Sequence, residues 1–576
     1  MTNTPTTVDS LSRGFRQRYL DHDELSGQLL GWAEAFPNVA ALTSLGKSGE
    51  GREIWMITIG PQPDRIRPAV WVDGNLHAGE LAGSSAALAI AEDALRLHLE
   101  PDAPLRDLPD HVRAHLRDVL FYVVPRISPD GAEAVLKTGR AIRSVPRDDR
   151  PHRQHPRWIQ QDVDGDGLAL SMRVVDPAGE LVESAEVPGL LLPRRIEDKG
   201  PYYKVYPEGI IEHFDGHHIP DPAFTADNDP DLNRNFPWSW RPEPEQLGAG
   251  AYPTSEPESR AVVEAAVARP NIFAWLNLHT FGGVHIRPLG HDRDAVMDRG
   301  DLALFRQIEE WAEAYTGYPM VSGFEQFTYQ PEKPLHGDLS DFAFHQRGCI
   351  AFVTELWDLF ARLDIERKPR FVQHYAELTR EEMIRLARFD AEHNAGRALR
   401  PWRAFHHPQL GDVEIGGIDP RVGLWNPSYE ALGETCDGQS ALWLRVAAMA
   451  PRLEIGELSA ESVGENISRV TCRVENRGYL PTHITAEAAK LPWNEPIWAD
   501  VQTDRCELIT GPAHLELGHL EGWGSGLHSG AGVPYFQRTR GNGSARTLSF
   551  TVRGHGVVRV RAGSCRAGTI EATLEL

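Results

Sequence analysis

His77 and Glu80 lie three positions apart in the stretch NLHAGELAG, between the apolar run PAVWVDG and the helix-like run SSAALAIAEDALRL. An imidazole and a carboxylate at this spacing can hold a metal ion from one turn, although a turn histidine and a glutamate at a helix N-terminus also occur for purely local reasons. A hydrolytic zinc ion takes three nitrogen or oxygen ligands from the protein and keeps one position for water. The pair therefore needs a distant third ligand, and His279 is the candidate.

Four short apolar runs each end in a polar or ionisable residue. They are PAVWVDG before His77, VLFYVVPR before Asp130, IFAWLNL before His279 and IAFVT before Glu355. Continuous apolar runs separated by helical segments predict an α/β fold with a mixed, mostly parallel sheet and helices on both faces. Ligands of such sheets bind outside the carboxyl ends of the strands. We therefore expect the side chains that follow these runs to meet at one edge of the sheet.

Five ordered motifs resemble those of the zinc carboxypeptidases, the carboxypeptidase A-like metallopeptidases. HAGE resembles the HxxE ligand motif of that family, SPDG its NPDG turn and DLNRNF its DxNRN substrate motif. LHT resembles the strand of the third ligand, and GDLSDFAFHQRGCIAFVTEL the segment that leads to the catalytic glutamate. The resemblance covers roughly residues 20 to 390 apart from an insertion. It implies a zinc-dependent carboxypeptidase that hydrolyses the C-terminal peptide bond of peptides.

The resemblance assigns roles to the residues that would carry out hydrolysis. One zinc ion per chain would be held by His77, Glu80 and His279. Glu355 would be the general base that takes a proton from water and delivers it to the leaving amine. Arg143, thirteen residues after the aspartate of SPDG, would stabilise the oxyanion. Arg140 and Arg147 are the neighbouring alternatives for that role.

The resemblance also implies how the substrate binds. Asn233 and Arg234 would bind its terminal carboxylate, a task suited to the guanidinium fork. Ser340 matches the floor of the pocket for the terminal side chain, and it is neither acidic nor bulky and apolar. The family places a mobile tyrosine where this chain has Lys333, and Tyr329 lies four residues earlier. Either of these two residues is a candidate to replace the tyrosine, and the side-chain specificity is open.

Two other functions compete with a carboxypeptidase. The first is a zinc amidohydrolase that acts on another amide, such as an N-acyl amino acid or a cell-wall peptide. It is motivated by the missing tyrosine and by Gly79, where digestive carboxypeptidases carry an arginine that helps to bind longer substrates. The second is a non-catalytic peptide-binding protein. A peptide-binding protein has no need of a general base, so Glu355 argues against it.

The pattern of apolar, polar and turn residues divides the chain into three regions. Residues 1–400 are expected to form the catalytic domain with an insertion at about 145–230, residues 401–450 a connecting segment, and residues 451–576 a β-sandwich-like domain of short alternating strands. Within the insertion, Asp162, Asp164 and Asp166 imitate the first half of a calcium loop. The twelfth position of that loop is Arg173 instead of glutamate, so we interpret the stretch as a hairpin turn.

Composition limits the partners and the compartment. The 576 residues include 59 basic and 82 acidic ones, and the net charge of -23 disfavours nucleic acid and anionic membranes as partners. The first twenty residues contain no apolar signal-peptide core, and no run elsewhere approaches the ~18 apolar residues of a membrane span. Five cysteines without a CxxC pair suggest reduced thiols. We therefore expect a cytoplasmic enzyme that acts on a peptide or amide, with an oligomeric state that the sequence leaves open.

Overall fold

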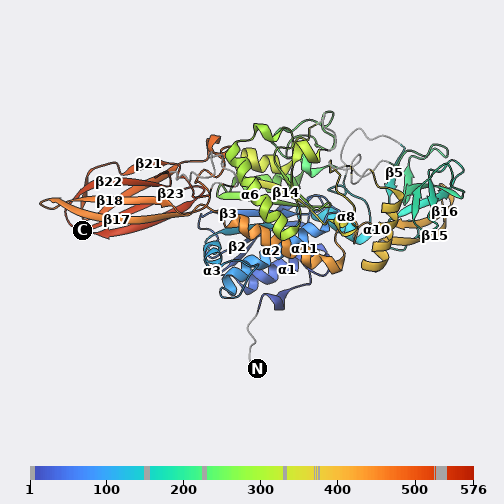
Figure 1. Ribbon diagram of the computed structural model, residues 1–576, viewed down its shortest axis with the longest axis horizontal. Coiled ribbons are helices and arrows are strands. Elements are labelled where there is room, and N and C mark those ends of the chain that lie inside the picture. Colours follow the sequence, from blue (N-terminus) through green and yellow to red (C-terminus); the bar gives the residue numbers. More distant parts are fainter. Residues whose placement is uncertain are drawn as a thin grey trace, which may run out of the picture.

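An eight-stranded mixed sheet forms the centre of the molecule in this computed structural model (Figure 1). In spatial order its strands are β1 (Ala40–Lys47), β2 (Glu53–Ile59), β4 (Leu120–Val124), β3 (Ala69–Gly74), β11 (Ile272–Thr280), β14 (Ile350–Leu356), β12 (Val284–Arg287) and β13 (Met320–Ser322). The four central strands β4, β3, β11 and β14 are parallel. β2 is antiparallel to both of its neighbours, and β12 is antiparallel to β14. The predicted mixed sheet with a parallel centre is confirmed.

The structure describes residues 7–147, 156–222, 230–328, 334–368, 370–371, 373, 377–524, 526 and 541–576. Its α-helices are α1 (His22–Ala35), α2 (Leu81–Leu99), α3 (Asp110–Leu116), α4 (Pro129–Thr138), α5 (Pro257–Val267), α6 (Arg299–Thr316), α7 (Leu339–Asp341), α8 (Leu359–Arg362), α10 (Arg380–His393) and α11 (Tyr429–Ala447). Short 3-10 or π segments are η1 (Asp9–Leu11), η3 (Leu232–Arg234), η4 (Asp294–Val296), η5 (Gly323–Phe327), η6 (Phe342–Gln346) and η7 (Ala488–Lys490).

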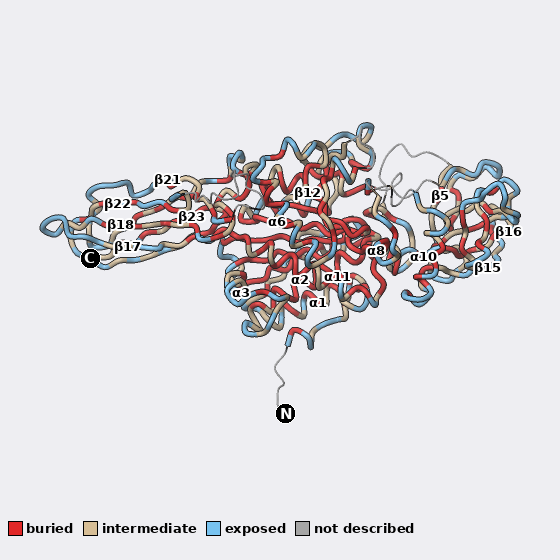
Figure 2. Tube along the Cα trace, viewed as in Figure 1, coloured by how far each residue is buried: buried red, intermediate tan, exposed pale blue. Residues whose placement is uncertain are grey.

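Helices cover both faces of the central sheet. Every residue of β3, β4 and β11 is buried, which requires cover on both sides because side chains alternate between the two faces. The buried residues concentrate in this central part of the molecule (Figure 2). Among the described helices, none is long and apolar enough to cross a membrane. The cytoplasmic location stays a prediction.

Two close backbone approaches bring the site together, and both require glycine. A Cβ atom at Gly83, in the first turn of α2, would lie 2.9 Å from Asn75 N and from Leu278 O, so only glycine lets this turn pack against β3 and β11. A Cβ atom at Gly131 of the SPDG turn would lie 1.9 Å from Ser144 O. Glycine here admits the segment that follows α4, which carries the predicted arginine.

The insertion contains two small sheets, at the opposite end of the central domain from the C-terminal domain (Figure 1). β5 (Arg157–Gln160) pairs with β10 (Gly209–Glu212). A six-stranded sheet has the order β15 (Leu399–His407), β16 (Gly411–Ile418), β6 (Ser171–Val175), β9 (Tyr202–Pro207), β7 (Leu181–Glu183) and β8 (Leu191–Pro193). Residues 401–450, expected to be a connection, thus contribute the β15–β16 hairpin to the insertion, and their helix α11 packs against α2 and α6.

The aspartate-rich stretch of the insertion is not a hairpin turn, because the strands on its two sides, β5 and β6, belong to different sheets. Its carboxylates accept hydrogen bonds from the backbone of the same loop: Asp162 from Gly165 N and Gly167 N, and Asp164 from Asp166 N. These local bonds are typical of aspartates in glycine-rich turns.

The C-terminal region forms two antiparallel sheets, as predicted. One contains β17 (Leu453–Gly464), β18 (Ile467–Asn476), β22 (Ala545–Arg553) and β20 (Glu507–Thr510), and the other β21 (His514–Gly518), β19 (Ile497–Asp504), β23 (Val557–Ser564) and β24 (Gly568–Glu575). A common apolar core lies between them. Arg566, fully buried in the β23–β24 turn, donates hydrogen bonds to the carbonyls of Ile272 and Arg347. This arginine attaches the β domain to the central sheet.

Candidate active site

The predicted metal ligands and the predicted base meet at the carboxyl edge of the central strands. His77 and Glu80 lie in the turn between β3 and α2. His279 is near the end of β11 and Glu355 near the end of β14, and the two residues face each other in the parallel pairing of these strands. The sheet therefore positions the four side chains together, although they span almost three hundred residues of sequence.

The nitrogen and oxygen atoms of the three ligands converge on one point. Nδ1 of His77 lies 2.8 Å from Oε1 of Glu80, and Nδ1 of His279 lies 2.9 Å from Oε2. The two Nδ1 atoms are 3.0 Å apart. His77, Glu80 and His279 are 4%, 2% and 1% exposed, so water does not separate these groups.

A hydrogen-bond acceptor lies at the far side of each ring. Nε2 of His77 lies 3.2 Å from Oδ1 of Asp231, and Nε2 of His279 contacts Oδ1 of Asn277. Both partners can accept from an Nε2 proton, and a neutral ring with its proton there presents the lone pair of Nδ1 toward Glu80. Two lone pairs and a carboxylate facing one another in a buried site repel unless a cation lies between them. Two imidazoles and one carboxylate are a donor set of zinc, so the residues fit this metal.

The hydrogen bond between His279 and Asn277 continues into a buried network that the sequence did not predict. Asn277 donates from Nδ2 to Oδ1 of Asp73, and the indoles of Trp71 and Trp275 donate to Oδ2 of the same carboxylate at 2.8 and 2.7 Å. Burial raises the pKa of Asp73 to about 7, although the three N–H donors oppose this shift. A polar residue inside the apolar run IFAWLNL is the signal in the sequence that could have pointed to Asn277.

Glu355 is partly exposed, but one of its carboxylate oxygens is buried. Its Oε2 atom is inaccessible and has no hydrogen-bond partner among the described residues. Burial and the nearby charge of Glu80 raise the pKa of Glu355 well above its ordinary value, and Arg143 partly opposes this shift. Burial alone would also raise the pKa of Glu80, but His77 and His279 lower it to about 2. The site thus holds one strongly acidic carboxylate and one that readily takes up a proton.

The turn that carries His77 and Glu80 is called the metal turn below. Arg143 is held beside this turn by its backbone and its side chain. Its carbonyl accepts a hydrogen bond from Ala78 N at 2.8 Å, and its Nε donates to Oδ2 of Asp231 at 3.0 Å. Arg147 instead pairs with Glu258 of α5 at 2.9 Å. Of these two arginines, the structure therefore places Arg143 at the site. Asp231 joins it to His77 and was missed as a functional residue, although it opens the motif DLNRNF.

Asn233 and Arg234 lie in η3, directly after Asp231. Oδ1 of Asn233 accepts a hydrogen bond from Leu339 N at 2.9 Å, which joins η3 to the start of α7. Arg234 is 8% exposed, and its charge acts on both Asp231 and Asp338. The two residues are therefore next to Arg143 and to the segment that carries the predicted pocket floor.

Ser340 lies in α7 and is 9% exposed. Its hydroxyl donates to Oδ1 of Asp338 at 2.7 Å. Burial and the charge of neighbouring Asp341 raise the pKa of Asp338 to about 6. Lys333 and Tyr329, the candidates for the missing tyrosine, lie outside the described residues.

Comparisons with known proteins agree with this geometry. Residues 29–166 and 221–366 match the family model of the zinc carboxypeptidases. The chain belongs to the zinc carboxypeptidase family. Residues 452–575 match a second model, a domain of unknown function (DUF8731).

The sequence relatives of this chain match limited parts of it. Carboxypeptidase B of Astacus astacus is 30% identical over 113 residues, which are 20% of this chain and 33% of the relative. Zinc carboxypeptidase of Saccharothrix mutabilis subsp. capreolus is 29% identical over 118 residues, 20% of this chain and 25% of the relative. The crystal structure of carboxypeptidase A from Helicoverpa armigera shares 20% identity at a TM-score of 0.38, covering 62% of this chain and 68% of that one. The chain thus spans about a third or less of the length of these two sequence relatives.

A tryptophan from the 401–450 segment lies beside the metal turn. A Cβ atom at Gly79 would lie 3.9 Å from the ring of Trp425, which is 39% exposed and packs edge-on against Phe281 at 4.9 Å. The next residue, Asn426, accepts from Ala82 N at 2.9 Å and donates to the carbonyl of Gly79 at 2.8 Å. The segment thereby caps α2 and covers the position where digestive relatives carry arginine.

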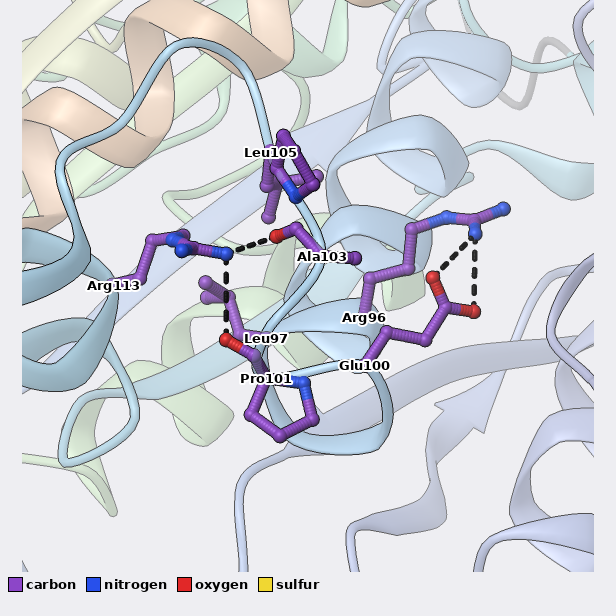
Figure 3. Close-up of a pocket in the computed structure, with 8 residues that line it drawn as sticks. Arg96, Leu97, Glu100, Pro101, Ala103, Leu105 and Arg113 are labelled. Carbon is purple, nitrogen blue, oxygen red and sulfur yellow. Dashed lines mark hydrogen bonds and ion pairs between the residues drawn. The ribbon is translucent and has the colours of Figure 1, made fainter.

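The pocket in Figure 3 is not part of the active site. Its lining includes Arg96 and Leu97 near the C-terminal end of α2, whereas the metal turn precedes the first residue of this helix. At a rise of 1.5 Å per residue the helix is roughly 28 Å long. The polar groups of the pocket bond to one another: Arg96 pairs with Glu100 at 3.0 Å, and Arg113 donates to backbone carbonyls (Figure 3). These contacts are structural.

Proposed function

We propose that this chain is a zinc-dependent metallocarboxypeptidase that hydrolyses the C-terminal peptide bond of peptides. The proposal depends above all on one observation: Glu355, with a buried and unpartnered carboxylate oxygen among the described residues, faces His279 in the register of β11 and β14. Burying a carboxylate without a partner is costly. A protein that only binds peptides has no use for such a group beside three converging metal ligands.

Each side chain of the site has a task in this reaction. A zinc ion held by His77, Glu80 and His279 would polarise a carbonyl and lower the pKa of water. Glu355 would take a proton from the attacking water and deliver it to the leaving amine, a role supported by its raised pKa. Arg143 would donate hydrogen bonds to the carbonyl oxygen as negative charge develops on it.

Recognition of a C-terminus would rest on Arg234 and Asn233. A guanidinium binds a carboxylate through two parallel hydrogen bonds, which a terminal amide cannot reproduce. Arg143 donates a hydrogen bond to Asp231, the residue just before η3, and this bond supports a shared site for the arginines and the substrate. Side-chain specificity stays open because Lys333 and Tyr329 are outside the described residues.

The test compares one peptide with a free C-terminus and the same peptide with a C-terminal amide, in the presence of zinc or of a chelator. We expect zinc-dependent loss of the last residue from the free peptide and none from the amide. Arg234→Lys keeps the charge but removes the fork, so kcat/KM should fall about 10- to 100-fold, the effect of losing a hydrogen bond to a charged group. The exposed Arg241→Lys is the matched control.

Other outcomes identify the competing functions. Equal cleavage of the free and the amidated peptide would favour a zinc amidohydrolase with a different substrate. Stoichiometric zinc without hydrolysis of any peptide in a library would favour a binding protein.

A further inference from the structure

A second group of metal-type side chains lies outside the catalytic set. Its members are His291, in the loop after β12, Asp341, at the end of α7, and His345, in η6. One ring nitrogen of each histidine and one carboxylate oxygen of Asp341 lie within 4.8 Å of one another. Asp341 and His345 are four residues apart on one helical segment, a spacing that places side chains on the same face.

His345 presents a buried nitrogen that lacks a partner. Its Nδ1 lies 3.0 Å from Oε1 of Glu487, while Nε2 is inaccessible and has no hydrogen-bond partner among the described residues. The side chain is 10% exposed. Leaving a buried polar atom unsatisfied costs about 1–3 kcal/mol, so an ordinary core histidine does not explain this position.

The surrounding residues hold the three ligands in place. The ring of Trp238 stacks on that of His345 at 4.3 Å and 15°, and the bond to Glu487 leaves Nε2 as the free ring atom. Gly290 N donates to both carboxylate oxygens of Asp341 at 3.2 Å. Metal-bound histidines commonly have a carboxylate on the other ring nitrogen, as His345 has here.

The charge around the group favours a cation. Nδ1 of His291 lies 2.9 Å from Oδ2 of Asp341. A Cβ atom at Gly290 would lie 3.3 Å from Oδ2 of Asp338 and 3.4 Å from Oδ2 of Asp341, so both carboxylates face the same point. Oδ2 of Asp338 also lacks a hydrogen-bond partner in the described part of the chain. Two neighbouring buried carboxylates repel each other unless positive charge offsets them.

We propose that His291, Asp341 and His345 form a second divalent metal site, independent of the catalytic ligands. Two imidazoles and one carboxylate suit zinc and similar transition ions, whereas calcium and magnesium prefer oxygen ligands alone. His291 is 27% exposed and gives the ion a path from solvent. The ion fixes the loop after β12 to the α7–η6 segment, and Glu487 extends this link to the C-terminal region.

The test counts metal by plasma mass spectrometry after equilibration with zinc and removal of free ion. We expect two equivalents in the native protein and one in His345→Phe, which keeps a ring to stack on Trp238, and in His291→Asn. His279→Ala should lose the catalytic ion and keep the second. The control His336→Asn alters a neighbouring histidine that bonds to Ser239 at 2.8 Å, and it should keep two equivalents.

Cobalt gives an independent readout. Cobalt-loaded His279→Ala should show visible d–d absorption that is lost when His291→Asn is added. One equivalent of zinc in the native protein, or two equivalents that persist in both His291→Asn and His345→Phe, would overturn the proposal. If His345→Phe does not fold by circular dichroism, the more exposed His291→Asn decides. Failure of peptide hydrolysis would leave this count unchanged, so the two proposals fail separately.

Discussion

Asn277 faces Asp73 in the parallel pairing of β11 and β3, and its side chain donates to the aspartate carboxylate. The same amide accepts from the ring of His279. Because Nδ2 is committed to Asp73, the orientation of the amide is fixed, and Oδ1 must face the histidine. The buried carboxylate of Asp73, two hydrogen bonds away from His279, therefore determines which ring nitrogen of His279 is free for a metal.

Asn277→Leu should weaken zinc binding about 10- to 100-fold, because the Nε2 proton of His279 loses its acceptor. Competition with a chromophoric chelator measures this change directly. Trp275→Phe is the matched control: it removes one bond to Asp73 and leaves Asn277 in place. Equal affinities for Asn277→Leu and the native protein would show that the amide does not position the ring.

Glu355→Gln should lower kcat about 10²- to 10⁴-fold while zinc content stays at its native value, because glutamine keeps the shape but cannot take up a proton. Steady-state kinetics and metal analysis on the same preparation test both parts. Glu34→Gln, which changes an exposed glutamate of α1, is the control. A parallel loss of zinc would mean that Glu355 supports metal binding instead of acting as a base.

The sequence predicted the central sheet because its strands are continuous apolar runs, and a polar side chain follows each run at the edge where the strands end. His77, Glu80, His279 and Glu355 could be placed together from that pattern alone. Asp73 could not be connected with His279, because the link depends on the register of β3 and β11, which the runs do not specify.

The rest of the site depends on segments that have no local signal. Trp425 and Asn426 reach the metal turn from a stretch that reads as a connection. His291 and His345 were not grouped because they are 54 positions apart and come together only through the fold. Side chains that share no motif or strand pattern can be grouped into a site only once the fold is known.

Trp425→Ala should raise KM for peptides of four or more residues by about 10-fold and leave dipeptide substrates nearly unchanged. The exposed indole beside Gly79 and Phe281 offers an apolar surface to the residues that precede the scissile bond, and burying an aromatic contributes about 1–3 kcal/mol. Kinetics with a series of peptide lengths checks this. Trp523→Ala, an exposed tryptophan of the C-terminal region, is the control. An equal effect at all lengths would indicate a structural role for Trp425.

His285 of β12 should make the protein sensitive to acid. It is fully buried between Thr354 and Thr316, at 2.7 and 3.1 Å. Burial, with a smaller contribution from the charge of Arg367, lowers its pKa from 6.5 to about 3. Between these values the unfolded chain binds a proton at this position and the folded chain does not, so the free energy of unfolding falls as pH drops below about 6.5.

At about 1.4 kcal/mol per pH unit for one proton, the loss between pH 6.5 and pH 5 is roughly 2 kcal/mol. His285→Gln should reduce the dependence of unfolding free energy on pH by this amount, whatever its effect on stability at pH 7. Urea unfolding at several pH values measures this dependence. The protein is treated with a chelator, so that proton-linked metal binding does not contribute. His111→Gln, which removes an exposed histidine of α3, should leave the pH dependence as it is. If His285→Gln and the native protein lose stability in parallel, the acid sensitivity must come from other buried groups.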